Sequence, residues 1–160
     1  MQRLTIATSV FLTLALACAG CGSARMGTAI ESLGEGDAEI ALSDRQGQES
    51  RTIVALAKLE KSLDEYLQKE GKIPSDLETL VPKYTSGIVT LDTGLAAHKP
   101  SNKVAYYPPE VIRDGFVDGT KLRDTGGWGY VHNERQIIVF VDCTHRNSRN
   151  RAWYQERGVN

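Results

Sequence analysis

Three side chains in the C-terminal half of the chain are of types that cysteine nucleophiles and metal sites use. Cys143 and His145 lie two residues apart, so in an extended strand their side chains would share one face. His132 lies in the preceding run, which we expect to pair with theirs as a hairpin. A thiol beside imidazoles can act as a nucleophile or bind zinc. One hypothesis is therefore a small enzyme or ligand-binding protein that uses Cys143, His145 and His132.

The number of candidate ligands argues against a metal centre. Zinc needs three or four ligands, and this group offers two or three. The aspartates Asp114, Asp118 and Asp124 lie among glycines, but their spacing does not fit an EF-hand loop, and acidic turns explain them. A half-buried strand cysteine and a solvated histidine explain Cys143 and His145. We therefore predict no catalytic residue, no metal and no cofactor.

A long amphipathic helix, predicted over residues 43–70, is the element against which the rest must pack. Ser43 and Gln46 form a capping-box start, and Gly71 directly after the last turn is a stop signal. Apolar residues recur at steps of three and four, the spacing of one helix face: Ile53, Leu56, Leu59, Leu63, Tyr66 and Leu67. Such a stripe must be buried against another element.

Short, strand-like segments follow this helix. A one- to two-turn helix is predicted over 75–81, and strand candidates lie at 88–91 and 104–107. The clearest pair is a hairpin of 128–132 with 137–143. Its second arm is apolar on both faces, as in a strand that is covered on both sides. We therefore predict an α+β fold, with one long helix packed on a small three- or four-stranded antiparallel sheet.

The first 20 residues have the pattern of an export signal. Arg3 gives a positive start, and residues 4–17 are nearly all apolar but too few for a membrane-spanning helix of about 20 residues. The sequence that follows, ACAGCGS, resembles the lipobox of bacterial lipoproteins. That resemblance implies a diacylglycerol on the cysteine thiol, cleavage just before the cysteine, and acylation of the new amine with a fatty acid such as palmitate.

Cys21 is the predicted lipid-attachment residue, because small residues precede it and Gly22 and Ser23 follow. Cys18 is the competing site, and an ordinary secretory signal that leaves an unlipidated thiol is the alternative. The resemblance implies a lipid-anchored protein of the cell envelope that faces the periplasm. Gly22, where inner-membrane lipoproteins often have Asp, favours the outer membrane over the inner one.

The predicted organisation has four parts: a signal peptide (1–20), a lipidated flexible tether (21–42), an α+β head (43–145) and a basic flexible tail (146–160). The tether is rich in Gly, Ser and acidic residues and would span about 25 Å. Its alternative is an extension of the long helix that includes Ile30, Leu33, Ile40 and Leu42. The arginines of the tail could contact anionic lipid headgroups, a partner or only solvent.

Two stretches carry a second resemblance. Residues 66–80, YLQKEGKIPSDLETL, are similar to the region after the long helix of type II secretion pseudopilins and type IV pilins. There an aromatic helix end is followed by a glycine, a proline and a short leucine-rich helix. Residues 125–130, TGGWGY, with the strand that follows, resemble the closing hairpin of these proteins. The resemblance covers about 50–143 and implies a pilin-like head.

Departures from that family limit the implied function. Pilins assemble through a long apolar N-terminal helix, where this chain has the lipobox-like segment, so we expect a monomeric head. The Asp-Pro-Trp-Gly motif of calcium-binding pseudopilins is absent, and no metal site is carried over. A net charge of −1 selects no nucleic-acid partner. We predict a non-enzymatic scaffold or accessory protein, anchored in the membrane, for type II secretion or pilus-type assembly. The alternative is a small periplasmic enzyme or ligand-binding protein.

Overall fold

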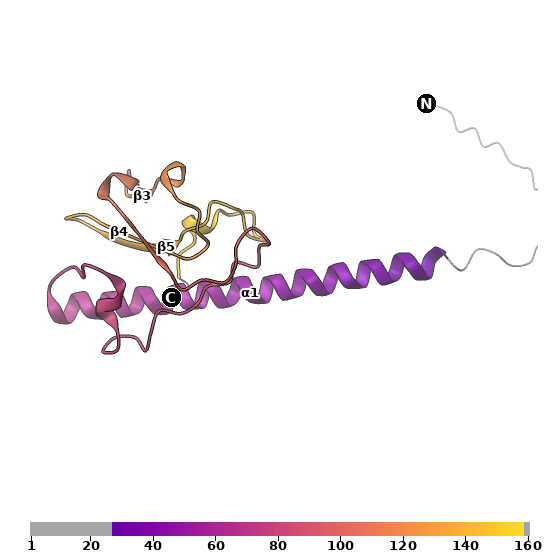
Figure 1. Cartoon of the computed structure of the whole chain (residues 1–160), viewed down its shortest axis with the longest axis horizontal. Helices are drawn as coiled ribbons and strands as arrows, with labels where there is room; N and C mark the ends of the chain where they lie inside the picture. Colours follow the sequence, from indigo (N-terminus) through magenta and orange to yellow (C-terminus); the bar gives the residue numbers. More distant parts are fainter. Residues whose placement is uncertain (1–26, 159–160) are drawn as a thin grey trace, which may run out of the picture. The chain divides into compact units, whose positions relative to one another are not determined.

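The structure, a computed structural model, describes residues 27–158 (Figure 1). The predicted signal peptide, Cys21 and its competitor Cys18 lie outside the described residues. The chain divides into two units, Met1–Gly36 and Asp37–Asn160, and the core and the site described below belong to the second. Among the helices of residues 27–158, none is long and apolar enough to cross a membrane.

The long helix α1 spans Gly27–Glu70 and begins well before the predicted start at Ser43. The prediction of a flexible tether is therefore wrong from Gly27 onward, and the alternative of a helical extension is confirmed. The glycines of this segment disfavour a helix by about 1 kcal/mol each, but good helix formers such as Ala, Leu and Glu separate them. Ser43 lies in the interior of α1, where its capping tendency has no free helix end to act on.

The apolar stripe of α1 is buried as predicted. Leu67 is half-buried. The other five side chains of the stripe lie in the main core: Ile53, Leu56, Leu59, Leu63 and Tyr66. Lys58, Lys61 and Asp64 on the other face are exposed. Gly71 has a φ of +64°, and its N–H donates to Leu67 O, so a glycine in the left-handed region ends the helix.

A three-stranded sheet lies along the C-terminal part of α1 (Figure 1). Its strands β1 (Val104–Tyr107), β4 (Trp128–His132) and β5 (Ile137–Val141) are arranged in the order β1-β4-β5. The predicted hairpin is confirmed, because β4 and β5 pair antiparallel with Trp128 opposite Val141. A second sheet has two strands, β2 (Ile112–Arg113) and β3 (Phe116–Val117).

The prediction of an entirely antiparallel sheet is wrong, because β1 pairs parallel to β4. A parallel pair needs a crossover of a dozen or more residues, and the connection 108–127 is long enough to supply one. The predicted strand at 88–91 is reduced to an isolated bridge between Leu91 and Ser101.

Four short 3₁₀ helices complete the described secondary structure: η1 (Leu77–Leu80), η2 (Pro109–Val111), η3 (Gly119–Lys121) and η4 (Trp153–Gln155). The first corresponds to the predicted short helix. Asp76 is its N-cap, and the carboxylate accepts a hydrogen bond from the backbone N–H of Thr79. Leu77 and Leu80 are fully buried, which fixes this turn to the core.

Both faces of the β4–β5 hairpin are covered, as the apolar pattern of β5 predicts. On one face Trp128, Tyr130, Val139 and Val141 pack with the stripe of α1. On the other face Val131, Ile138 and Phe140 pack with Val111 and Val117, around the small β2–β3 sheet. The hairpin is therefore the centre of the fold, between α1 and the smaller sheet.

The segment 146–158 of the predicted flexible tail is instead attached to the core at several points. Trp153 is fully buried in the main core. The buried carboxylate of Glu49 on α1 accepts hydrogen bonds from the backbone N–H and the hydroxyl of Ser148. Near the end, Gly158 N donates to Glu60 Oε2 over 2.8 Å. Trp153 in the core and the carboxylates of Glu49 and Glu60 on α1 thus hold this arginine-rich segment in place.

The face assignment of α1 leads to a stability prediction. Leu63, 5% exposed, lies in the main core, and Leu63→Ala should lower the free energy of unfolding by about 2–5 kcal/mol. Lys61→Ala on the exposed face should change it by less than about 0.5 kcal/mol. Chemical denaturation of both variants is the measurement. Equal losses in the two would contradict the assignment.

Candidate functional site

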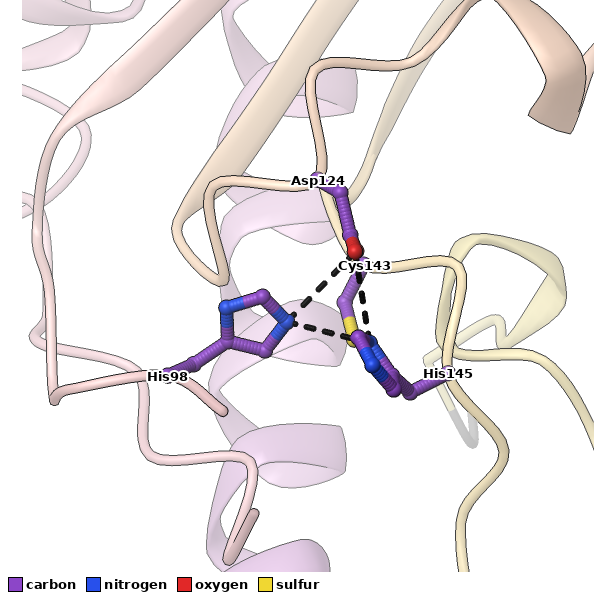
Figure 2. A group of neighbouring side chains, drawn as sticks. All are labelled: His98, Asp124, Cys143 and His145. Atoms are coloured by element: carbon purple, nitrogen blue, oxygen red, sulfur yellow. Dashed lines mark hydrogen bonds and ion pairs between the residues drawn. The ribbon is translucent and has the colours of Figure 1, made fainter. Parts of the chain in front are cut away.

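Four side chains with metal-ligating or nucleophilic chemistry meet at one end of the β4–β5 hairpin (Figure 2). They are His98, Asp124, Cys143 and His145, and one ligand atom of each lies within 4.8 Å of those of the other three. His98 comes from the loop that the Leu91–Ser101 bridge closes, and Asp124 from the connection between η3 and β4. The other two follow directly after β5. Three separate segments thus build the cluster.

The buried carboxylate of Asp142 holds two of these segments together. It accepts hydrogen bonds from the backbone N–H and the hydroxyl of Thr125, at 3.2 and 2.6 Å, and from the hydroxyl of Tyr107, at 2.7 Å. Its backbone is also paired, since Gly126 N donates to Asp142 O and Asp142 N donates to Gly127 O. The turn that carries Asp124 is therefore fixed to the strand end that carries Cys143.

Asp124 faces both histidines. Its Oδ1 lies 3.5 Å from His98 Nε2, and its Oδ2 lies 3.3 Å from His145 Nδ1. Oδ1 also accepts a hydrogen bond of 2.7 Å from the backbone N–H of Thr144. Burial alone raises the pKa of this carboxyl group, but the Thr144 hydrogen bond and the two imidazoles outweigh it, and the net effect lowers the pKa. The carboxylate is thus kept ionised.

Close packing against Gly126 places the ring of His98. Gly126 has a φ of +72°, and a Cβ there would lie 2.6 Å from both Cβ and Cγ of His98. The side chain of His98 is only 8% exposed. A glycine is therefore required here twice over, by the backbone conformation and by the imidazole that lies against it.

The thiol of Cys143 is fully buried and lies 3.7 Å from His145 Nδ1. Burial raises its pKa to about 12, so the isolated thiol is protonated at neutral pH. Catalytic cysteines have the opposite shift, because the thiolate is the nucleophile. The environment of Cys143 therefore does not activate it.

The contacts of His145 also differ from those of a catalytic base. In a nucleophile–histidine–carboxylate triad, one ring nitrogen faces the nucleophile and the other faces the carboxylate. In this cluster a single atom, His145 Nδ1, faces Cys143 Sγ, Asp124 Oδ2 and His98 Nε2, the last at 3.3 Å. The polar atoms thus gather around one imidazole nitrogen, and Figure 2 shows His98, Asp124 and His145 in mutual contact rather than in a relay. Four ligand atoms within 4.8 Å of one another could together hold a metal ion.

His132 does not belong to this site, so the predicted group of Cys143, His145 and His132 is wrong in one member. His132 pairs with Ile137 beside the hairpin turn, whereas Trp128 pairs with Val141 at the other end. Four residues of strand separate the two ends by about 13 Å. In the antiparallel register, the end of β4 that lies near Cys143 is its start, not its finish.

Sequence reasoning missed two of the four residues. His98 lies in an irregular loop, and no spacing motif links it to Cys143. Asp124 was grouped with Asp114 and Asp118 as acidic turns. That interpretation holds for the other two, since Asp114 is exposed in the β2–β3 turn and Asp118 caps η3. Only the fold shows that Asp124 belongs with the histidines.

Comparisons with protein-family models, with curated proteins and with solved structures returned no match for this chain.

Gly126→Ala should destabilise the protein and displace His98. The left-handed conformation alone costs a non-glycine residue about 1–2 kcal/mol, and the contact with the imidazole adds to this. Gly87→Ala is the matched control, because a Cβ there meets nothing within 4 Å and its φ is not positive. Urea denaturation of both variants gives the comparison. A Gly126→Ala protein as stable as the Gly87→Ala protein would contradict the packing described for His98.

Proposed function

We propose that this chain is a lipid-anchored protein of the cell envelope with a pilin-like, non-enzymatic head. Its role would be that of a scaffold or accessory protein in type II secretion or pilus-type assembly. The anchor rests on the ACAGCGS sequence at the end of the predicted signal peptide. The role of the head rests on the resemblance of two stretches to pseudopilins and pilins, and on how these stretches meet.

The contact between those two stretches is the observation that carries the proposal. Gly71 ends α1 in the left-handed conformation, and the chain then runs through Pro74 into η1. Tyr130 in β4 donates a hydrogen bond of 2.6 Å from its buried hydroxyl to Pro74 O. The helix-ending stretch and the closing hairpin therefore pack as one unit. This supports a common origin of the two resemblances better than their order in the sequence alone does.

The site geometry favours a non-enzymatic role. The enzymatic alternative was based on Cys143, His145 and His132, and His132 lies at the far end of the hairpin from the other two. The remaining thiol is buried, with a raised pKa. The cluster of His98, Asp124, Cys143 and His145 is better suited to hold a metal ion than to act as a nucleophile.

The way α1 is used supports a monomeric head. Its apolar stripe is already buried in the core of the protein. The large apolar side chains exposed on the described part of the chain, such as Ile40, Val54, Val89 and Phe116, are scattered over several elements. Partners among the envelope components would then meet an exposed surface of mixed polarity. Such contacts are weak in solution, and a lipid anchor would strengthen them by raising the effective concentration.

Cys21→Ala should release the protein from the membrane fraction and abolish its labelling by radioactive palmitate, because the acylated thiol and amine both belong to this residue. Cys18→Ala is the matched control and should leave both properties unchanged. Fractionation and labelling of the two variants in a bacterial host is the measurement. Labelling that survives Cys21→Ala and disappears in Cys18→Ala would move the site, and labelling that neither change affects would end the lipoprotein proposal.

Cys143 should resist alkylation in the folded protein when a chelator keeps the thiol free of metal. With a pKa of about 12, the thiolate fraction at pH 8 is about 10⁻⁴, against roughly a quarter for an ordinary cysteine. Iodoacetamide should therefore react at least about 1,000-fold more slowly with Cys143 than with the same residue in urea. Mass spectrometry, with Cys143→Ser as the background, measures the two rates. Rapid labelling in the folded state would favour the enzymatic alternative.

A further inference from the structure

We propose that His98, Asp124, Cys143 and His145 bind one divalent transition-metal ion, best matched by zinc, as a four-coordinate structural site. The inference starts from two imidazole nitrogens, one carboxylate oxygen and one thiol that all lie within 4.8 Å of one another. It is independent of the lipid anchor and of the pilin-like resemblance, because it uses only contacts within the compact unit Asp37–Asn160.

The separations between the ligand atoms fit a tetrahedral ion. Zinc bonds of about 2.0–2.3 Å place tetrahedral ligands roughly 3.3–3.8 Å apart. His98 Nε2 and His145 Nδ1 are 3.3 Å apart, and Asp124 Oδ2 lies 3.3 Å from His145 Nδ1. Cys143 Sγ lies 3.7 Å from His145 Nδ1. All pairs lie within 4.8 Å, so small side-chain rotations would complete the tetrahedron.

The charge and type of the ligands select the ion. A thiolate and a carboxylate contribute two negative charges, which a divalent cation neutralises, and the two imidazoles bind as neutral groups. Thiolate and imidazole ligands suit zinc and related transition metals, whereas calcium and magnesium prefer sites made of oxygen atoms. An electrically neutral complex also suits this position, where the side chain of His98 is largely buried, Asp124 is half-buried and Cys143 is fully buried.

The surroundings orient the ligands in advance. The backbone N–H of Thr144 occupies Asp124 Oδ1 and leaves Oδ2, which faces His145 Nδ1, as the oxygen for the metal. Gly126 packs against the side chain of His98, and Asp142 holds the turn that carries Asp124 through its hydrogen bonds with Thr125. Such outer contacts are typical of metal sites, because they hold each ligand in its binding orientation.

The proposed ion would link three segments that hydrogen bonds and packing already bring together at this corner. These are the loop around His98, the turn at Asp124 and the chain after β5. Four protein ligands close the coordination sphere, which distinguishes structural zinc sites from catalytic ones with an open position. The site would therefore stabilise the head rather than perform a reaction.

Cobalt titration tests the site directly. The full-length protein would be purified with a reductant, freed of metal by a chelator and titrated with Co²⁺, which substitutes for zinc and is coloured. We expect one equivalent of Co²⁺ to produce a sulfur-to-cobalt charge-transfer band and the intense visible bands of tetrahedral cobalt, and Zn²⁺ to remove both. Failure to bind Co²⁺ or Zn²⁺ with these properties would overturn the proposal.

Three variants assign the ligands. Cys143→Ser should abolish the charge-transfer band, which also separates this thiol from Cys18 and Cys21. Asp124→Asn keeps an acceptor for Thr144 N but loses the charge, and should weaken zinc binding by at least about 100-fold, measured against a chromophoric chelator. His132→Gln is the matched control and should bind zinc like the parent protein. A charge-transfer band that survives Cys143→Ser, or an equal loss of affinity in His132→Gln, would place the metal elsewhere and refute the assignment.

Discussion

The β4–β5 hairpin is buried on both of its faces, and the rest of the described chain is arranged to satisfy that constraint. A strand with apolar side chains on both faces needs a cover on each. The stripe of α1 covers the face that carries Trp128 and Val139, and the small β2–β3 sheet packs over the face that carries Phe140. Because α1 and the β2–β3 sheet both lie outside the hairpin in sequence, the segments that connect them to β4 and β5 run past the ends of these strands. The polar and irregular segments therefore gather at those ends.

The end of the hairpin near Val141 is where this polar chemistry is concentrated. The first residue after β5 is the buried Asp142, whose carboxylate would be costly to bury without partners. The Tyr107 hydroxyl and two donors of Thr125 supply them. The same hydrogen bonds bring the turn of Asp124 beside Cys143. The candidate metal site thus depends on the hydrogen bonds that the buried carboxylate of Asp142 accepts.

Local patterns in the sequence predicted the parts of the fold that local physics determines. The stripe through Leu63 and the arms of the hairpin follow from periodicity, and the structure confirms both. The start of α1 was missed because a capping residue such as Ser43 does not end a helix that can continue. The parallel pairing of β1 with β4 was missed because pairing direction depends on the path of a long connection rather than on the strands.

In the cluster, too, residues close together in the sequence could be predicted and residues far apart could not. Cys143 and His145 are neighbours in sequence and could be singled out together. His98 and Asp124 reach them only through the loop closed by the Leu91–Ser101 bridge and through the turn held by Asp142. The arginine-rich composition of the C-terminal segment gave no sign that Trp153 would be buried or that Ser148 would donate a hydrogen bond to Glu49. Contacts between residues far apart in the chain leave no spacing signal in a single sequence.

X-ray absorption at the zinc edge, on protein purified without added metal, identifies the atoms that bind the metal. We expect about one zinc per chain, with a first shell of one sulfur at about 2.3 Å and three nitrogen or oxygen atoms at about 2.0–2.1 Å. A first shell of nitrogen and oxygen alone, or of several sulfurs, would contradict the ligand set of His98, Asp124, Cys143 and His145.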